Sequence, residues 1–405
     1  MSFFDDLETR SADQRASDLA LALPAQIANA QKLSGYADAV GAVDASAIQT
    51  IEDLAGLPVL RKSDLVQAQS GNGPLGGYGA LKTHEFAHIF QSPGPIYEPG
   101  GIGHDWWRIG RFLNAVGIGS RDIVQNCFGY HLTPAGMIFE NGARAVNAAV
   151  VPAGVGQTEL QVRAASDIGT TAYAGTPDYL KVILDKADEL GVKLGITKAA
   201  VGGGALFPSL RQEYADRGVL CLQNYATADL GNVAYESQAM DGMIVDEGVI
   251  VEIVTPGTGN PVAVGEVGEV VVTTLNRDYP LVRFATGDLS AVMAGQSPGG
   301  RTNMRIKGWM GRADQTTKIK GMFVRPEQVA DLVAKHDEID RARVIAIRDG
   351  EMDGMIVQLE TSATDAAQYE ASVIDCLKLR GLIELVAPGG LPRDGLVIED
   401  QRKYD

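Results

Sequence analysis

Positive charge and long apolar runs are both scarce in this chain of 405 residues. Lys and Arg together number 35 against 51 Asp and Glu, which gives a formal net charge of -16. Basic residues form no run longer than a pair, so nucleic acid and anionic membrane surfaces are not expected as partners. No apolar run approaches the roughly 20 residues that span a bilayer, so no transmembrane helix is expected.

Cysteine is scarce as well. Cys127, Cys221 and Cys376 lie far apart and form no CxxC pair, which predicts reduced core thiols and a cytoplasmic protein. The start, "MSFFDDLETRSADQR", has no basic segment followed by an apolar one, so no signal peptide is expected. Cys127 and His131 would share a helical face, but two candidate ligands do not make a metal site.

Strand and helix patterns alternate from about residue 120 to residue 225. The segments "RDIVQNCF", "TTAYAG" and "VLCLQNY" are typical of strands, and "TPAGMIFENGARAV" is typical of a helix. In the helix "TPDYLKVILDKADELG", Thr176 is a capping residue, Pro177 stands at the first position and Gly191 follows the end. Such repeated units predict a parallel sheet that helices cover on both faces.

Other patterns flank this α/β region. The segment "HDWWRIGRFLNAVG" predicts a helix from near Asp105, its cap, to Gly117. After residue 235, "GVIVEIV", "GEVGEVVVTTL" and "PLVRFAT" predict a smaller antiparallel β-rich part. From Gly311 a mixed α+β module of about 90 residues follows. We therefore expect a large N-terminal α/β domain over residues 1–312 and a small α+β domain over 313–405.

Three glycine-containing turns follow strands: "VGGGAL", "NYATADLG" and "RFATGDLS". Ligands of open α/β sheets lie beyond the carboxyl ends of the strands, and glycine lets them approach the backbone closely. One nucleotide could meet all three turns, with its base on Tyr225, its ribose on Asp288 and a phosphate-bound magnesium on Asp229. Taken singly, each feature is weak, because Asp in a turn usually serves the turn itself.

A fourth segment, "FQSPGPIYEPGG", stands between an apolar run and the helix expected near Asp105. A Ser- and Gly-rich loop after a strand often grips a nucleotide phosphate. This segment has no Lys, and each Pro removes a backbone N–H that an anion would need. It is a phosphate loop, the remnant of one, or only a turn.

The order and spacing of these segments resemble the adenylate-forming superfamily, and more narrowly the phenylacetate–CoA ligase group of acyl- and aryl-CoA ligases. The resemblance extends over nearly the whole chain and includes "NCFGYHLTPAG", "VVPAGVGQTELQV", "GTPDYL" and "GRADQTTKIKGMFVRPEQV". It implies a large N-terminal domain and a C-terminal lid that rotates between two half-reactions. In the first, ATP and a carboxylate give an acyl-adenylate and pyrophosphate. In the second, CoA thiolate displaces AMP.

The resemblance also implies roles by position. The nucleotide would be bound by Ser92, Gly94, Gly202, Gly203, Gly204, Ala205, Asn224, Tyr225, Asp288 and Arg312. Tyr130, His131 and Gly136 would line the acyl or aryl pocket, although a buried core histidine is an alternative for His131. Catalytic roles would fall to Asp229, Arg312 and Thr227, with Asp229 also holding Mg²⁺, and Asp314 would lie at the lid hinge.

The sequence departs from the family at three places. The phosphate-loop segment keeps Ser92 and Gly94 but lacks the family's Lys. The hydroxyl expected beside Asp229 is supplied one place earlier, by Thr227. After Gly395, where the family has a Lys, the chain has Leu396.

Three hypotheses follow: an ATP-dependent acyl- or aryl-CoA ligase, a nucleotide- or CoA-ester-binding protein that has lost the chemistry, and an enzyme of the thioester half-reaction only. The first is favoured. Its small-molecule carboxylic acid, aromatic or short acyl, is not identified by the sequence, and the resemblance also allows a homodimer.

Overall fold

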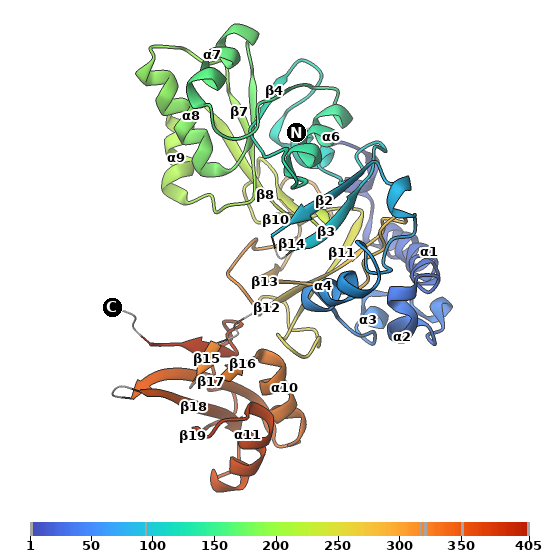
Figure 1. Ribbon diagram of the computed structural model, residues 1–405, viewed down its shortest axis with the longest axis vertical. Coiled ribbons are helices and arrows are strands. Elements are labelled where there is room, and N and C mark those ends of the chain that lie inside the picture. Colours follow the sequence, from blue (N-terminus) through green and yellow to red (C-terminus); the bar gives the residue numbers. More distant parts are fainter. Residues whose placement is uncertain are drawn as a thin grey trace. The chain divides into compact units, whose positions relative to one another are not determined.

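The computed structural model describes residues 3–93, 95–313, 315, 317–319, 322–349 and 352–402 (Figure 1). The chain divides into two compact units, each described by itself below. Unit 1 comprises Met1–Val251, Val272–Phe284 and Met293–Trp309, and unit 2 comprises Glu252–Val271, Ala285–Val292 and Met310–Asp405.

Unit 1 begins with helices. The first is α1 (Ala12–Ala30), which starts where the Ser11 hydroxyl accepts a hydrogen bond from the Gln14 amide at 3.1 Å. It is followed by α2 (Ala37–Val40), α3 (Ile51–Leu54), the short strand β1 (Leu60–Arg61) and α4 (Lys62–Gly71). In α4 the Asp64 carboxylate accepts from the Arg61 amide at 3.1 Å, which fixes the first helical turn.

The segment "FQSPGPIYEPGG" forms an antiparallel hairpin. Strand β2 (His88–Ser92) pairs with β3 (Ile96–Gly100), and Ser92 lies opposite Ile96. Of the turn between them, Pro93 and Pro95 are described and Gly94 lies outside the described residues. The segment predicted to be an altered phosphate loop thus consists, in its described residues, mainly of two paired antiparallel strands.

The helix expected from Asp105 starts later than predicted. Helix α5 spans Gly110–Val116, because Asp105 and Arg108 have left-handed backbones, with φ of 47° and 63°, which a right-handed helix cannot contain. The Asp105 carboxylate nevertheless accepts from the Gly110 amide at 2.9 Å and so caps the helix from outside. The predicted end at Gly117 is confirmed by its φ of 90°.

The predicted parallel sheet is confirmed. Its strands run in the order β5-β4-β6-β7-β8 and all pair in parallel. Their bounds are β4 (Ile123–Asn126), β5 (Ala149–Pro152), β6 (Ala172–Gly175), β7 (Lys198–Val201) and β8 (Leu220–Thr227). The intervening helices are α6 (Ala135–Ala145), α7 (Thr158–Ile168), α8 (Pro177–Glu189) and α9 (Pro208–Asp216). Thr176 precedes α8 as expected, but its side chain makes no capping hydrogen bond to a described residue.

Alternating residues of the strands build two separate cores. Ala172, Ala174 and Leu222 pack on one face with Phe112 of α5 and Phe139 of α6. On the other face Tyr173, Ala199 and Cys221 pack with α8 and α9 through residues such as Leu180 and Tyr214. Figure 1 shows α7, α8 and α9 on one side of β7 and β8 and α6 on the other. Both faces are thus covered by helices, as predicted.

Antiparallel strands extend the sheet beyond β8. Strands β9 (Gly231–Glu236), β10 (Met243–Val245) and β14 (Arg305–Ile306) follow in the spatial order β8-β9-β10-β14. The expected β-rich part is formed by β11 (Val249–Val254), β12 (Val267–Thr274) and β13 (Phe284–Met293), which contribute residues to both units. Strand β13 begins later than the predicted "PLVRFAT", because Arg283 has a φ of 47° and interrupts an extended strand there.

Unit 2 contains the predicted α+β module. A hairpin of β15 (Thr317–Ile319) and β16 (Met322–Val324) leads to α10 (Pro326–Ala334). A sheet in the order β19-β18-β17-β20 then carries α11. The bounds are β17 (Ile339–Asp349), β18 (Met352–Thr361), α11 (Glu370–Leu377), β19 (Leu382–Val386) and β20 (Ile398–Asp400). Leu332 of α10 and Leu377 of α11 pack on Leu359 of the sheet, which gives the module its own core.

None of the helices in the described part of the chain is long and apolar enough to cross a membrane.

Candidate active site

A cavity of about 170 Å³ opens in unit 1 beyond the carboxyl ends of β7 and β8. Four segments that are distant in the sequence line it: the end of β2, the start of α6 with the turn before it, the turn after β7, and the end of β8. The lining residues are Ser92, Phe128, Thr133, Pro134, Ala135, Ile138, Phe139, Gly202, Gly203, Asn224, Ala226, Thr227 and Ala228. Five residues to which the sequence assigned nucleotide-binding or catalytic roles therefore share one cavity: Ser92, Gly202, Gly203, Asn224 and Thr227.

Gly202 leaves room for the side chain of Asn224. A Cβ at residue 202 would lie 2.4 Å from Asn224 Oδ1, far inside van der Waals contact. Asn224 is buried, and its Nδ2 donates to Asn232 Oδ1 at 3.0 Å. Its Oδ1 is buried and has no hydrogen-bond partner in the described part of the chain. Because unpaired buried acceptors are costly, this oxygen is suited to accept from a ligand donor.

The turn after β8 holds Thr227 and Asp229. The Thr227 hydroxyl accepts from the Leu230 amide at 3.1 Å and so closes the turn. The Asp229 carboxylate is buried, and its Oδ2 accepts from Lys62 Nζ at 3.0 Å. Its Oδ1 is buried without a hydrogen-bond partner among the residues described. That orphaned oxygen fits a carboxylate that also binds a cation, as the sequence predicted for Mg²⁺.

Other predicted nucleotide-binding residues do not line this cavity. Gly204 and Ala205 follow Gly203 but are exposed outside it. Tyr225 is buried in β8 opposite Ala234 of β9, and neighbouring residues on its strand, Asn224 and Ala226, face the cavity instead. The alternation of side chains along a strand accounts for this difference.

The predicted acyl-pocket residues are partly brought together. Asn126 Nδ2 donates to the Tyr130 hydroxyl at 2.7 Å and to the Gly136 carbonyl at 2.8 Å. A Cβ at residue 136 would lie 2.8 Å from the Tyr130 ring, so the glycine lets the ring pack against α6. His131 is exposed. The alternative of a buried core histidine is therefore wrong, and the next residue, Leu132, is exposed as well.

Two predicted residues lie together in unit 2. Asp288 of β13 pairs with Arg312 through a backbone bridge, and its carboxylate accepts from Arg312 Nη1 at 3.0 Å. Gly287, with a φ of 73°, leaves the space that the guanidinium needs, since a Cβ there would lie 2.8 Å from Arg312 Nη2. Asp314, the predicted hinge residue, lies outside the described residues, as does Gly94.

Sequence reasoning missed Lys62, which contacts Asp229, and two buried polar residues, Glu98 and Tyr279, whose pKa the Asp229 charge affects. Lys62 is the first residue of α4 and contacts Asp229 from a distance of 167 residues in the chain. Glu98 of β3 is fully buried, and burial raises its pKa to about 7, a shift to which the Asp229 carboxylate adds. Ser92 and Lys62 act in the opposite direction on that pKa. One sequence feature could have indicated the buried carboxylate of Glu98: it is a lone Glu in the apolar segment "PIYEPGG".

Tyr279 completes this group. Its hydroxyl is buried without a hydrogen-bond partner among the described residues. Burial, followed by the negative charge of Asp229, raises the pKa of Tyr279 well above its usual range. The phenol is therefore neutral at physiological pH and can donate one hydrogen bond.

Comparisons with known proteins agree with this architecture, although no family model matches the chain. It is 28% identical over 337 residues to the phenylacetate–coenzyme A ligase of Thermus thermophilus, covering 79% of this chain and 75% of that protein. It is 27% identical over 417 residues to the phenylacetate–coenzyme A ligase of Escherichia coli, covering 97% and 93%. The chain is thus similar to phenylacetate–CoA ligases over most of its length.

Solved structures are similar to this chain in fold. An open conformation of 2-hydroxyisobutyryl-CoA ligase, in complex with 2-HIB-AMP and CoA, matches with a TM-score of 0.71 at 23% identity. That match covers 95% of this chain and 91% of that one. The same ligase in its thioesterification state matches with a TM-score of 0.70. The fold is thus that of adenylate-forming CoA ligases, and the predicted fold class is confirmed.

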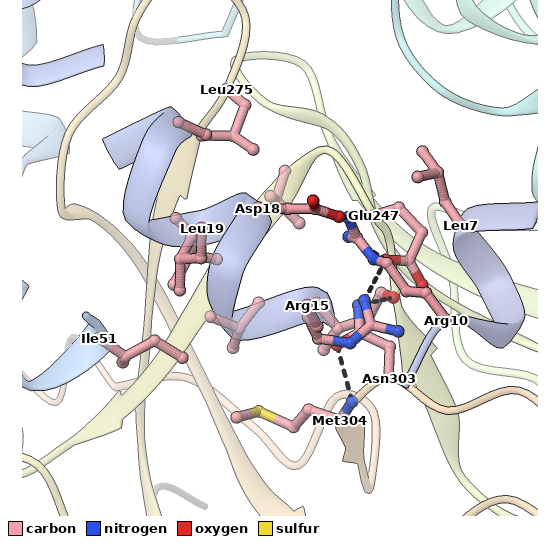
Figure 2. A pocket seen from close by; sticks show the side chains of 15 residues that line it. Leu7, Arg10, Arg15, Asp18, Leu19, Ile51, Glu247, Leu275, Asn303 and Met304 are labelled. Atoms are coloured by element: carbon pink, nitrogen blue, oxygen red, sulfur yellow. Dashed lines mark hydrogen bonds and ion pairs between the residues drawn. The ribbon is translucent and has the colours of Figure 1, made fainter. Parts of the chain in front are cut away.

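Unit 1 has a second cavity, of about 240 Å³, beside α1 (Figure 2). Figure 2 shows the guanidinium groups of Arg10 and Arg15 directed at the Glu247 carboxylate, and Arg10 also pairs with Asp18. The two guanidinium groups thus lie against the two carboxylates, of Glu247 and Asp18, and the positive and negative charges balance. None of the predicted site residues lines this cavity in the described chain. It is therefore not the candidate active site.

Proposed function

We propose that the protein is an ATP-dependent acyl- or aryl-CoA ligase that works through an acyl-adenylate. In the first step a carboxylate oxygen of the acid attacks the α-phosphorus of ATP and pyrophosphate leaves. In the second, the CoA sulfur, having lost its proton, attacks the acyl carbon and AMP leaves. The relationship to phenylacetate–CoA ligases over most of both chains supports this assignment.

One observation carries the proposal for this chain in particular. Ser92, Gly202, Gly203, Asn224 and Thr227, from three distant segments, line one cavity beyond the carboxyl ends of parallel strands. That is where ligands of α/β sheets bind. In the proposal Asn224 Oδ1 accepts from the nucleotide base, while Asp288 and Arg312 of unit 2 act on the ribose and phosphate side. Tyr130, His131 and Gly136 bind the acid.

The proposal includes Mg²⁺ at Asp229, whose buried Oδ1 is an oxygen ligand of the type that Mg²⁺ prefers. When bound, Mg²⁺ supplies positive charge to phosphate oxygens.

The acid is aromatic or short acyl, because Phe128 and Phe139, stacked with centroids 4.3 Å apart, give the cavity a flat apolar wall. A cytoplasmic location is supported by three free and buried cysteines, and a homodimer stays a prediction.

A catalytically impaired binding protein is the second candidate. It is favoured by the hairpin, where Pro93 and Pro95 lack amide donors and the charged residue is the buried Glu98. A third candidate is an enzyme of the thioester half-reaction only.

Exchange of labelled pyrophosphate into ATP, measured with a broad panel of carboxylic acids, tests the ligase. Exchange that depends on one acid is expected. Absence of exchange with every acid, while ATP binding persists in calorimetry, would instead support the binding protein. Transfer of the acyl group from acyl-CoA to AMP with release of CoA, or from a supplied acyl-adenylate to CoA with release of AMP, without exchange would support the third candidate.

A further inference from the structure

Unit 2 contains a cavity of about 420 Å³. It is lined by the connection between β11 and β12, by α10 and β17, and by the segment 391–397 that precedes β20. All of these lining residues belong to unit 2. Of the described residues to which the sequence assigned a site role, none lines it. Cavities that bind small molecules commonly measure about 300–1,000 Å³, so this one has room for a ligand.

Part of the lining is apolar. Val329 and Val333 of α10 contribute to it, together with Val262, Leu391 and Leu396. Val329 and Leu391 are buried. Removing a hydrocarbon group from water against such side chains is favourable. The ligand is therefore expected to carry an apolar body.

Two arginines of β17 supply positive charge to the same cavity. Arg341 and Arg343 are two residues apart and both line it, as the alternation of side chains along a strand allows. Arg343 is 5% exposed, and its Nε is buried without a hydrogen-bond partner in the described part of the chain. Arg341 Nη1 is likewise buried, with no partner among the residues described. Buried donors without a partner are costly, so these two N–H groups are suited to donate to ligand oxygens.

Carboxylates of the protein already compensate two of the arginines at this cavity. Arg343 pairs with Asp394 and, through Nη1, with Glu399 at 3.4 Å. Arg393, which also lines the cavity, pairs with Glu266 at 2.7 Å. These two guanidinium groups therefore add no net charge to the site.

Arg341 is different. Its Nη2 donates to the Pro392 carbonyl at 3.4 Å, and no ion pair joins it to a carboxylate of the described residues. Asp340, the nearest residue in the chain, also lines the cavity but is exposed, so solvent weakens its charge. One positive charge is thus left for a ligand.

We propose that this cavity binds an organic monocarboxylate with an apolar body, at a site that shares no lining residue with the candidate active site. The ligand carboxylate accepts from Arg341 Nη1 and Arg343 Nε, and its hydrocarbon part packs on Val329 and Leu391. A single negative charge matches the one guanidinium without an ion pair. The inference does not depend on the proposed ligase activity, since no residue assigned to that reaction takes part.

Titration calorimetry with octanoate, on the full chain without ATP or CoA, tests the proposal. Octanoate is expected to bind, and octanamide, of the same length but uncharged, should bind at least tenfold more weakly. Arg341→Met should weaken octanoate binding by about tenfold or more, because a hydrogen bond to a charged group is lost. Arg348→Met removes an exposed arginine of the same strand, outside the cavity, and is the matched control with unchanged affinity.

A second variant tests the cavity by volume instead of charge. Ala330 lines it from α10 and is only partly buried, so Ala330→Phe should fill the space without disrupting the helix and should weaken octanoate binding. Unchanged octanoate affinity in either folded variant, Arg341→Met or Ala330→Phe, would overturn the inference. So would equal affinities for octanoate and octanamide, or no binding by the wild type at millimolar octanoate.

Discussion

At the scale of single residues, the candidate site depends on small side chains that make room for polar ones. Gly202 lies against Asn224, Gly136 against Tyr130 and Gly287 against Arg312, and in each case a Cβ would lie within 2.8 Å of its neighbour. The sequence indicated that glycines let a ligand approach. The structure adds that several of them admit a neighbouring side chain instead.

Gly202→Ala should lower the affinity for AMP at least tenfold, because the new methyl group displaces Asn224 from the cavity. Gly204→Ala is the matched control, since its Cβ would lie 3.4 Å from Pro177 Cδ, an ordinary contact. Titration calorimetry with AMP measures both. Equal affinities in the two variants would mean that Asn224 does not contact the nucleotide.

Asp105 should make stability depend on pH. Burial raises the pKa of its carboxyl to about 6, with the Asp246 carboxylate adding to the shift, against an ordinary value of 3.8. Between about pH 4 and pH 6 the folded state therefore holds more protons than the unfolded state, so stability falls as pH rises, by about 3 kcal/mol at most. Urea unfolding of wild type and Asp105→Asn across this window should give a difference that grows with pH. A constant difference would refute the raised pKa.

At the scale of elements, turns decide which side chains enter the site. The β2–β3 hairpin carries Ser92 to the cavity and buries Glu98, and the β8–β9 connection presents Thr227 and Asp229. A hairpin with two prolines offers fewer amide donors than an open loop would. An anion bound at this point would therefore depend mainly on side-chain donors.

Thr227→Val should loosen the β8–β9 turn, because the Leu230 amide loses its acceptor. A loss of about 1 kcal/mol in unfolding free energy is expected, together with weaker AMP binding as Asp229 loses its fixed position. Thr227→Ser keeps the hydroxyl and should preserve both properties. Thermal unfolding measures the stability of the two variants, and titration calorimetry measures their affinity for AMP. Equal stability and equal affinity in Thr227→Val and Thr227→Ser would exclude a role for the hydroxyl.

At the scale of the whole molecule, the chain is built as two units with separate cores, and the predicted roles are divided between them. The cavity residues belong to unit 1, whereas Asp288, Arg312 and Leu396 belong to unit 2. The family resemblance implies a lid that brings a lysine to the first half-reaction. Here the corresponding residue is Leu396, whose amide donates to Asp394 Oδ1 at 3.0 Å.

Leu396→Lys should raise the rate of adenylation at least tenfold, because it restores positive charge where charge develops in the transition state. Leu396→Met, uncharged and of similar length, is the control and should leave the rate unchanged. Initial rates of pyrophosphate exchange compare the three proteins. The same rate in all of them would show that residue 396 does not reach the reacting groups.

The sequence by itself determined the α/β pattern, because strand and helix periodicity and terminal Pro and Gly residues are local properties. For the same reason it located the glycine turns and the ends of α8. It missed the left-handed backbones of Asp105 and Arg283, which depend on buried surroundings rather than on local preference.

Only the tertiary structure decided which residues share the cavity and which do not. Lys62 and Asp229 are in contact although they are far apart in the chain, and Glu98 is buried in a hairpin whose register no local pattern reveals. Contacts of this kind arise from packing between distant segments. A charge pattern read along the chain therefore cannot locate them.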